Sequence, residues 1–293
     1  MRTAERDARA AADAGPIVDA HTHFFPFRMS RAVWRFFEER NWPMPHQKPP
    51  EALARDLAAA GVSHYTLLNY VKREGQAAAL NAWTAEFAAA HPEALPFGTV
   101  HALDPDPLAT VEPYLDRFLG VKIQPLVCEF GVDDPRLEPV LARLCALDKI
   151  LLAHAGTAPY PNAWVGLERL ERALARFPEL RVIVAHMGAY EVERAFALLV
   201  RYPRVCLDTA MIFTRTDLFP RDPAPSPESI ERYSNRILFG SDYPNIPYPY
   251  AEAVASIVRL PVSPEAKRRI LYDNAAAVFG IGPAASKEAA CSG

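Results

Sequence analysis

The sequence predicts an α/β fold of eight strand–helix units, the (β/α)8 or TIM barrel. Strand-like and helix-like segments alternate from residue 17 to about residue 280, which is typical of a parallel sheet connected by crossover helices. The chain has 293 residues, so it can hold a barrel of roughly 250 residues with modest insertions. A doubly wound sheet is the competing architecture, but no Gly-x-Gly-x-x-Gly string follows the first expected strand.

Eight apolar runs are the expected strands. In chain order they are Ile17–His23, His64–Tyr70, Leu95–His101, Gly120–Pro125, Ile150–His154, Val182–His186, Val205–Thr209 and Ile237–Asp242. Amphipathic stretches rich in Ala and Leu are the expected helices between them. These are Gln76–Ala90, Asp134–Leu147, Gly166–Phe177, Glu191–Val200 and Ala251–Arg259. We expect one domain over residues 16–281, with an N-terminal tail at 1–15 and a C-terminal tail at 282–293.

Two connections are longer than a barrel needs. The segment Phe24–Pro50 is rich in aromatic residues, and Phe213–Pro227 is rich in proline. Both follow the carboxyl ends of expected strands, where barrel enzymes place their active sites. We therefore expect the first segment to be a long aromatic loop insertion, and both segments to form walls or lids of a pocket. The alternative is that the aromatic side chains cover barrel helices or form a subunit contact.

Charge and composition indicate a small-molecule substrate. The formal net charge is −3 and no basic stripe is present, so neither nucleic acid nor an anionic membrane is an expected partner. No apolar stretch reaches the roughly 20 residues that span a bilayer, and the first 15 residues contain no long apolar segment of the signal-peptide type. We expect a cytoplasmic protein. Its four cysteines are widely spaced, without a Cys-x-x-Cys pair, and are interpreted as reduced thiols.

Residues of the type that bind metals stand at several expected strand ends. His21 and His23 alternate with Thr22 on a strand, so both imidazoles point to the same side. Two further apolar runs end in His154 and His186, each followed by a residue and then glycine. The last expected strand ends in Asp242, which adds a carboxylate. A set of three imidazoles and one carboxylate suits Zn²⁺ and leaves a position for water. The alternative is that each histidine only satisfies backbone groups at the barrel mouth.

The order and context of these residues resemble the amidohydrolase superfamily, in particular its amidohydrolase-2 branch of aminocarboxymuconate-semialdehyde-decarboxylase-like enzymes. The resemblance extends from residue 17 to about residue 280. The strings that carry it are Asp19-Ala-His-Thr-His23, Ala153-His-Ala-Gly156, Ala185-His-Met-Gly188 and Phe239-Gly-Ser-Asp-Tyr-Pro244.

This resemblance implies a metal site and a catalytic group. His21, His23, His154 and Asp242 would bind one divalent metal, and His186 would lie beside it as an acid/base or polarising group. Asp242 would also exchange protons with a metal-bound water. We expect Zn²⁺, with Mn²⁺, Co²⁺ and Fe²⁺ as alternatives.

The fourth expected strand bears on the number of metals. Binuclear members of the superfamily are described as using a carboxylated lysine at the end of this strand. Here Lys122 comes early in the short strand, and Gln124 shares its face nearer the carboxyl end. We therefore expect Gln124 to face the barrel mouth and a single metal to be bound. Related sequences commonly have histidine where Gln124 stands.

Five residues are candidates for substrate binding. Gln124 can donate and accept hydrogen bonds, and His101 ends the third expected strand. Tyr70 and Tyr190 lie at or just beyond strand ends, where active-site loops begin. Arg28 follows the His-Thr-His string and is a candidate clamp for a carboxylate. For each one, ordinary packing or surface exposure is the alternative.

The leading functional prediction is a mononuclear metal-dependent hydrolase, in which metal-bound hydroxide attacks a lactone, amide or related carbonyl bond. The alternative is a non-oxidative decarboxylase of an unsaturated or aromatic carboxylate. A third possibility is a barrel that binds metal or ligand without catalysis. By analogy with the branch that it resembles, the chain could form a homodimer, with the aromatic segment Phe24–Pro50 as the contact.

Overall fold

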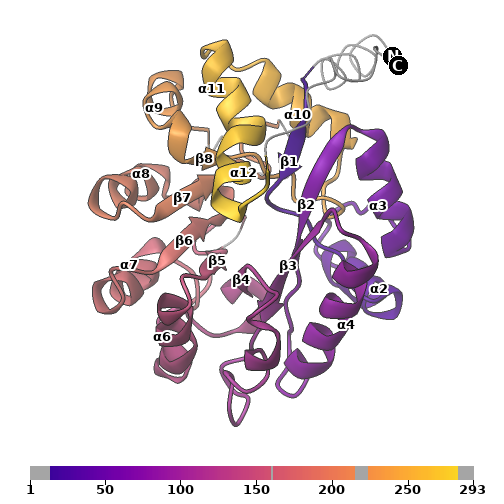
Figure 1. Cartoon of the computed structure of the whole chain (residues 1–293), viewed down its shortest axis with the longest axis vertical. Helices are drawn as coiled ribbons and strands as arrows, with labels where there is room; N and C mark the ends of the chain where they lie inside the picture. Colours follow the sequence, from indigo (N-terminus) through magenta and orange to yellow (C-terminus); the bar gives the residue numbers. More distant parts are fainter. Residues whose placement is uncertain (1–13, 160, 215–223, 283–293) are drawn as a thin grey trace.

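The centre of the computed structural model is a parallel eight-stranded sheet surrounded by helices (Figure 1). The structure describes residues 14–159, 161–214 and 224–282. Strand order follows chain order from β1 to β8, which confirms the (β/α)8 barrel. The strands are β1 Ile17–Asp19, β2 Val62–Leu68, β3 Ala94–Thr99, β4 Gly120–Ile123, β5 Ile150–Ala153, β6 Arg181–Val184, β7 Val205–Asp208 and β8 Ile237–Leu238. Both predicted tails lie largely outside the described residues, as does much of the proline-rich segment.

Every strand ends earlier than the sequence pattern suggests. The difference is one residue for β5, which ends at Ala153, and four residues for β1, which ends at Asp19. The candidate ligands therefore stand on irregular backbone just beyond the strands. His186 and Asp242 both adopt positive φ angles, of 54° and 71°. Such backbone is uncommon for residues other than glycine and is concentrated at functional sites.

The predicted helices are present with small shifts of their ends. They correspond to α4 Ala77–Ala90, α6 Glu138–Ala146, α7 Leu167–Arg176, α8 Val192–Arg201 and α10 Tyr250–Val258. The helices that the sequence pattern did not predict are short, or lie within or at the end of the aromatic segment. They are α2 Phe27–Glu38, α3 Pro50–Ala59, α5 Pro125–Cys128, α9 Pro227–Arg232, α11 Pro264–Arg268 and α12 Asn274–Phe279. In the described part of the chain, no helix has the length and apolar character to cross a membrane.

Helix α12 covers one end of the barrel interior (Figure 1). Its Phe279 packs edge-on against Phe97 of β3, with ring centroids 6.2 Å apart. Buried apolar residues from β1, β5, β6 and β8 join the same cluster. The amino-terminal end of the barrel is thus filled, and the carboxyl-terminal end is the side on which a site can open.

The barrel closes through irregular backbone pairing between the segments that follow β1 and β8. The His23 amide donates to the Tyr243 carbonyl at 2.8 Å, and the Asp242 amide donates to the His21 carbonyl at 2.8 Å. A single parallel bridge between Thr22 and Tyr243 belongs to the same seam. The seam places the two histidines after β1 beside the aspartate after β8.

Asp19 reinforces this seam from beneath. Its carboxylate accepts from the backbone amides of His21 and Ser241 at 3.1 and 3.0 Å, and from the Tyr250 hydroxyl at 3.0 Å. Burial raises the pKa of Asp19 to about 7, although these hydrogen bonds act in the opposite direction. One buried side chain therefore links β1, the segment after β8, and α10.

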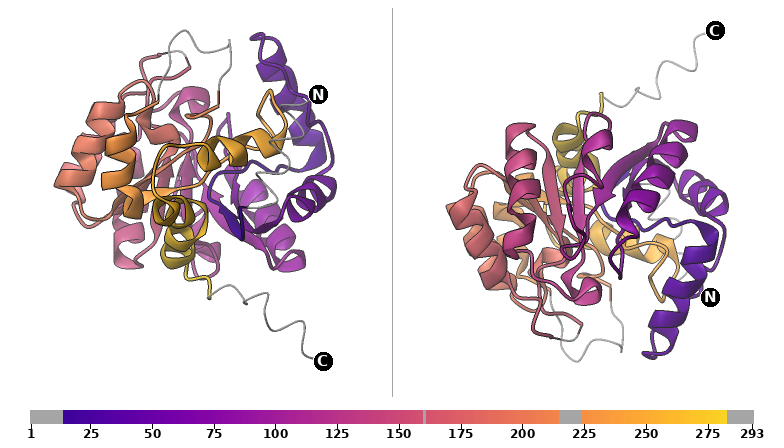
Figure 2. Two further views of the ribbon diagram at one scale, coloured as in Figure 1. Left: turned by 90° about the horizontal axis from the view of Figure 1, so that it is seen from above. Right: turned by 90° about the horizontal axis from the view of Figure 1, so that it is seen from below.

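The aromatic segment after β1 is not a loop throughout, so that expectation is corrected. It contains helix α2, in which Ser30 and Trp34 are buried at i,i+4 spacing on one face. Figure 2 shows this dark violet helix at the rim of the barrel. Beyond the helix, the Trp42 indole donates to the Asn245 carbonyl at 2.8 Å. The segment is thereby attached beside the loop that carries Asp242.

We predict that Gly120→Ala destabilises the barrel by about 3 kcal/mol or more. A Cβ at this position would lie 1.8 Å from the Ile150 carbonyl oxygen of the neighbouring strand, and backbone cannot move aside as a side chain can. Urea denaturation followed by circular dichroism measures the effect. Gly282→Ala is the control, since nothing lies within 4 Å of its added Cβ. Equal stability of the two variants would contradict the prediction.

Candidate metal centre

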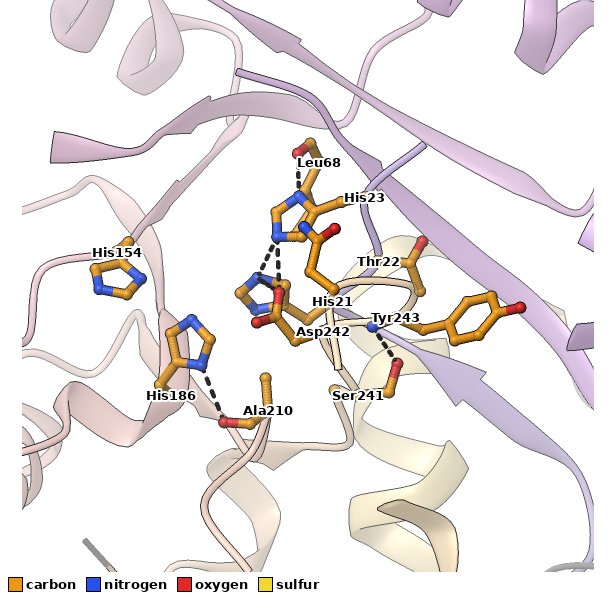
Figure 3. A network of polar contacts seen from close by, with 12 residues as sticks. His21, Thr22, His23, Leu68, His154, His186, Ala210, Ser241, Asp242 and Tyr243 are labelled. Atoms are coloured by element: carbon orange, nitrogen blue, oxygen red, sulfur yellow. Dashed lines mark hydrogen bonds and ion pairs between the residues drawn. The ribbon is translucent and has the colours of Figure 1, made fainter. Parts of the chain in front are cut away.

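Three predicted ligands meet at the carboxyl end of the barrel (Figure 3). His21 Nε2 and His23 Nε2 lie 3.1 Å apart. The Oδ1 atom of Asp242 is 2.8 Å from His23 Nε2 and 3.5 Å from His21 Nε2. All three ligand atoms fall within 4.8 Å of one another. The seam described above is what brings them together.

The outer hydrogen bonds of the two imidazoles show which nitrogen faces the cluster. His21 Nδ1 lies 2.8 Å from the Asp208 carboxylate, and His23 Nδ1 lies 2.6 Å from the Leu68 carbonyl oxygen. Both partners are acceptors, so each Nδ1 donates a proton outward and each ring turns its Nε2 toward the cluster. The two Nε2 atoms and the Asp242 carboxylate then converge on one point. A divalent cation can bind all three atoms there.

The pKa shifts favour the protonation states that a metal needs. Burial, with the nearby charge of Lys122, holds the pKa of His21 well below its usual value, so the imidazole is neutral. For Asp242, burial alone would raise the pKa. The hydrogen bond with His23 and the charges of the surrounding histidines outweigh it and bring the pKa of this carboxyl below its usual range. A neutral imidazole and an ionised carboxylate are the forms that bind divalent ions.

His154 and His186 face the trio from β5 and β6. Their ring centroids are 4.7 Å apart, and that of His186 is 4.8 Å from that of His21. His154 Nε2 donates to the Ala158 carbonyl at 2.9 Å, while its buried Nδ1 has no hydrogen-bond partner among the described residues. His186 Nδ1 donates to the Ala210 carbonyl at 2.9 Å. Each ring therefore keeps one nitrogen free of protein partners.

Asp208, which the sequence analysis left without a role, orients two of these histidines. Its Oδ2 accepts from His21 Nδ1, and its Oδ1 accepts from the backbone amides of His186 and Ala210 at 2.8 and 3.1 Å. The side chain is fully buried at the end of β7. A carboxylate on the outer nitrogen of a metal-binding imidazole fixes the ring and its tautomer. The position of Asp208 at the end of an expected strand is the sequence feature that could have identified it.

The donor set fits a divalent cation. His21, His23 and Asp242 supply three converging atoms, and the unpartnered Nδ1 of His154 supplies a fourth candidate. Nitrogen and oxygen donors of this kind suit Zn²⁺, Mn²⁺, Fe²⁺ and Co²⁺. The predicted ligands are therefore near one another, although His154 is not part of the tight trio.

A cavity of about 340 Å³ opens beside the cluster. His23, His154, His186 and Asp242 line it, whereas His21 lies behind them. The remaining wall is mostly apolar. It includes Phe37, Trp42, Tyr70, Leu126, Met211 and Ile212. A cavity of this size holds a small organic molecule.

Two of the five predicted substrate residues line this cavity, Gln124 and Tyr70. The other three are absent from its wall. His101 is buried elsewhere, accepts from the Leu103 amide at 3.2 Å and packs edge-on against Phe130. Tyr190 follows Ala189, which lines the wall in its place, and Arg28 is exposed on α2. Proximity to a strand end did not specify the direction in which these side chains point.

The cavity wall includes a cation that the sequence analysis missed, Arg40. Its guanidinium stacks 3.7 Å above the Phe36 ring and donates one hydrogen bond, of 2.8 Å, to the Phe36 carbonyl. No carboxylate of the described residues forms an ion pair with it. Arg40 is the second residue after α2. Its position at the cavity therefore depends on this helix, which the sequence pattern did not predict.

Comparison with known families places the chain in the amidohydrolase family. The model for this family, described as Amidohydrolase, matches residues 18–281. The chain therefore belongs to the amidohydrolase-2 family of metal-dependent enzymes, as the sequence motifs predicted. No curated protein matches the chain in a sequence search.

Solved structures share the fold. An uncharacterised TIM-barrel protein from Bordetella bronchiseptica has a TM-score of 0.70 and 24% identity, covering 90% of this chain and 98% of its own. The 5-carboxyvanillate decarboxylase of Novosphingobium aromaticivorans, complexed with manganese and 4-hydroxy-3-methoxy-5-nitrobenzoic acid, has a TM-score of 0.64 and 16% identity over 91% and 96%. A 2,6-dihydroxybenzoate decarboxylase from Rhizobium has a TM-score of 0.60 and 16% identity over 91% and 98%.

We predict that Asp208→Asn weakens metal binding by about 10- to 100-fold while the protein stays folded. The amide no longer offers a charged acceptor to His21 Nδ1, so the ring loses its fixed tautomer. Competition with a chromophoric chelator for Zn²⁺ measures the affinity. Asp106→Asn, an exposed change that leaves the barrel interior untouched, serves as the control. Wild-type affinity in Asp208→Asn would show that the histidine does not need this partner.

Proposed function

We propose that the protein is a metal-dependent, non-oxidative decarboxylase of small aromatic or unsaturated carboxylates. The observation that carries the proposal is the position of the trio His21, His23 and Asp242, which can hold a cation, beside a small cavity with mostly apolar walls. Hydrolysis, the leading prediction from sequence, has support only at the level of the family. Decarboxylation has the additional support of several structural neighbours.

The names of these neighbours suggest the substrate class. They are named as decarboxylases of 5-carboxyvanillate or 2,6-dihydroxybenzoate, and one of them is complexed with manganese and a nitrobenzoic acid. A cavity of about 340 Å³ accommodates a single substituted ring. Aromatic and aliphatic wall residues such as Phe37, Trp42 and Ile212 provide contact surfaces for such a ring.

Two polar groups in the cavity suit a carboxylate or hydroxyl substituent. Arg40 offers guanidinium donors at the edge, with no competing carboxylate among the described residues. Gln124 lies on the wall, and its buried Oε1 has no hydrogen-bond partner in the described part of the chain. An amide can both donate and accept, which matches a hydroxyl group on the substrate. These groups would orient the ring while the apolar wall excludes water from it.

Decarboxylation breaks the bond between the carboxyl group and the ring carbon, and the electron pair left on that carbon takes up a proton as CO₂ departs. A divalent metal bound by the trio would supply the electrophilic charge that holds the substrate's oxygen atoms. The proton has to be held by groups that face the cavity. His186 can exchange a proton at Nε2, because its Nδ1 is hydrogen-bonded to the Ala210 carbonyl. The Asp242 side chain remains 14% exposed. We assign proton transfer to this pair.

We predict that metal-loaded protein makes a weakly buffered solution of a hydroxybenzoate more alkaline, because each turnover consumes a proton and releases CO₂. Indicator absorbance and CO₂ capture measure the reaction together. His154→Ala and Asp242→Asn should lower turnover by at least about 10²-fold with the fold intact. Acidification with lactones or amides, and no CO₂ from any carboxylate, would favour the hydrolase instead.

We predict a second effect on binding. Arg40→Gln should raise KM for the carboxylate by about tenfold and change kcat little, because a contact at the cavity edge acts on bound substrate and transition state alike. Arg28→Gln is the matched control, since Arg28 is exposed on α2, which ends two residues before Arg40, and does not line the cavity. Steady-state kinetics of both variants test the assignment. An equal rise in KM for both would remove Arg40 from the site.

A further inference from the structure

Lys122 is a buried cation that the proposed reaction leaves unexplained. It lies on β4, its side chain is fully buried, and its Nζ has no hydrogen-bond partner among the described residues. A buried ammonium without a partner is costly, and such groups in folded proteins call for a specific explanation. Gln124, two residues further along, lines the cavity, and Lys122 does not. Lys122 pairs in register with Leu152, two residues before His154. Lys122 therefore lies deeper in the barrel than the residues of the metal centre.

The groups that act electrostatically on Lys122 surround the metal centre. Burial lowers the pKa of Lys122 to about 8, while the carboxylates of Asp208 and Asp242 act to raise it. In turn, the charge of Lys122 lowers the pKa values of His21 and His154. The side chain thus interacts with Asp208 at the end of β7 and with residues that follow β1, β5 and β8. At neutral pH it carries a positive charge.

We propose that Lys122 sets the net charge of the loaded metal centre and thereby its affinity for an anionic substrate. This inference rests on the proposed function, because it assumes a bound divalent ion and a carboxylate ligand. When the imidazoles are neutral, the charge of a divalent ion and the charges of the Asp208 and Asp242 carboxylates add up to zero. The ammonium of Lys122 raises this net charge to +1. Lys122 is a positioning residue in this sense, because it acts on the substrate through the metal centre.

Two effects of opposite sign follow from this charge. A buried cation repels the metal ion, so Lys122 lowers metal affinity. The same cation attracts the substrate carboxylate, so Lys122 raises carboxylate affinity. Charges separated by several ångströms in a protein interior interact strongly enough to change affinities by tenfold or more, since salt screens buried groups little. A residue that only supported the fold would weaken both affinities together.

The test is Lys122→Met, which keeps the length of the side chain and removes the charge. We expect Zn²⁺ affinity, measured by chelator competition, to rise by about tenfold or more. We expect the affinity of the Zn²⁺-loaded protein for 4-hydroxy-3-methoxy-5-nitrobenzoate, measured by calorimetry, to fall by a similar factor. Lys149→Met is the matched control. Its amine donates to the Phe118 carbonyl near the start of β5, at the opposite end of the barrel.

The outcomes separate this inference from the proposed function. If wild-type protein binds neither Zn²⁺ nor the nitrobenzoate, the proposed function fails. If wild type binds both, and Lys122→Met leaves both affinities unchanged or weakens both, only the role of Lys122 is overturned. Lys122→Gln, polar but uncharged, is the second variant should the methionine not fold. Misfolding of both, with Lys149→Met folded, would assign Lys122 a structural role and also overturn the inference.

Discussion

The seam between the segments after β1 and β8 is the contact on which the site depends. Regular strand pairing ends before the seam, and backbone hydrogen bonds such as that from the Asp242 amide to the His21 carbonyl take over. The Asp19 carboxylate holds both sides from beneath. Gly240 permits the close approach, since a Cβ there would lie 2.7 Å from His21 Cβ. Without this seam the histidines and Asp242 would lie on separate strands with no common centre.

Beside the seam, the outer nitrogens of His21 and His23 both have hydrogen-bond partners within the protein. Asp208 and the Leu68 carbonyl accept hydrogen bonds from Nδ1 of His21 and His23, so the Nε2 atoms face Asp242. The arrangement is costly for the protein alone, because it gathers lone pairs and a carboxylate in a buried place. A divalent ion turns the same arrangement into a favourable one. Metal binding and preorganisation of the histidines are therefore two aspects of one network.

Charge is distributed in layers along the barrel axis. Lys122 lies within β4, in register with a residue that precedes His154, whereas the trio follows the strand ends and Arg40 lines the cavity. Between the trio and Arg40 the wall is mostly apolar, which strengthens electrostatic interactions by excluding water. An anionic ring with an apolar body complements this order of charges. The same layers would serve a hydrolase less directly, because a neutral lactone or amide gains little from two cations.

The sequence by itself determined the barrel and the main site residues. Alternating segments predict a parallel sheet, and parallel strands bring their carboxyl ends to one face, so His21, His23, His154, His186 and Asp242 were expected together. Only the tertiary structure decided which polar side chains face the cavity. Arg40, two residues after the end of α2, lines the cavity, while His101 and Arg28 do not. Side-chain direction on irregular backbone depends on packing between distant segments, and local sequence does not encode that packing.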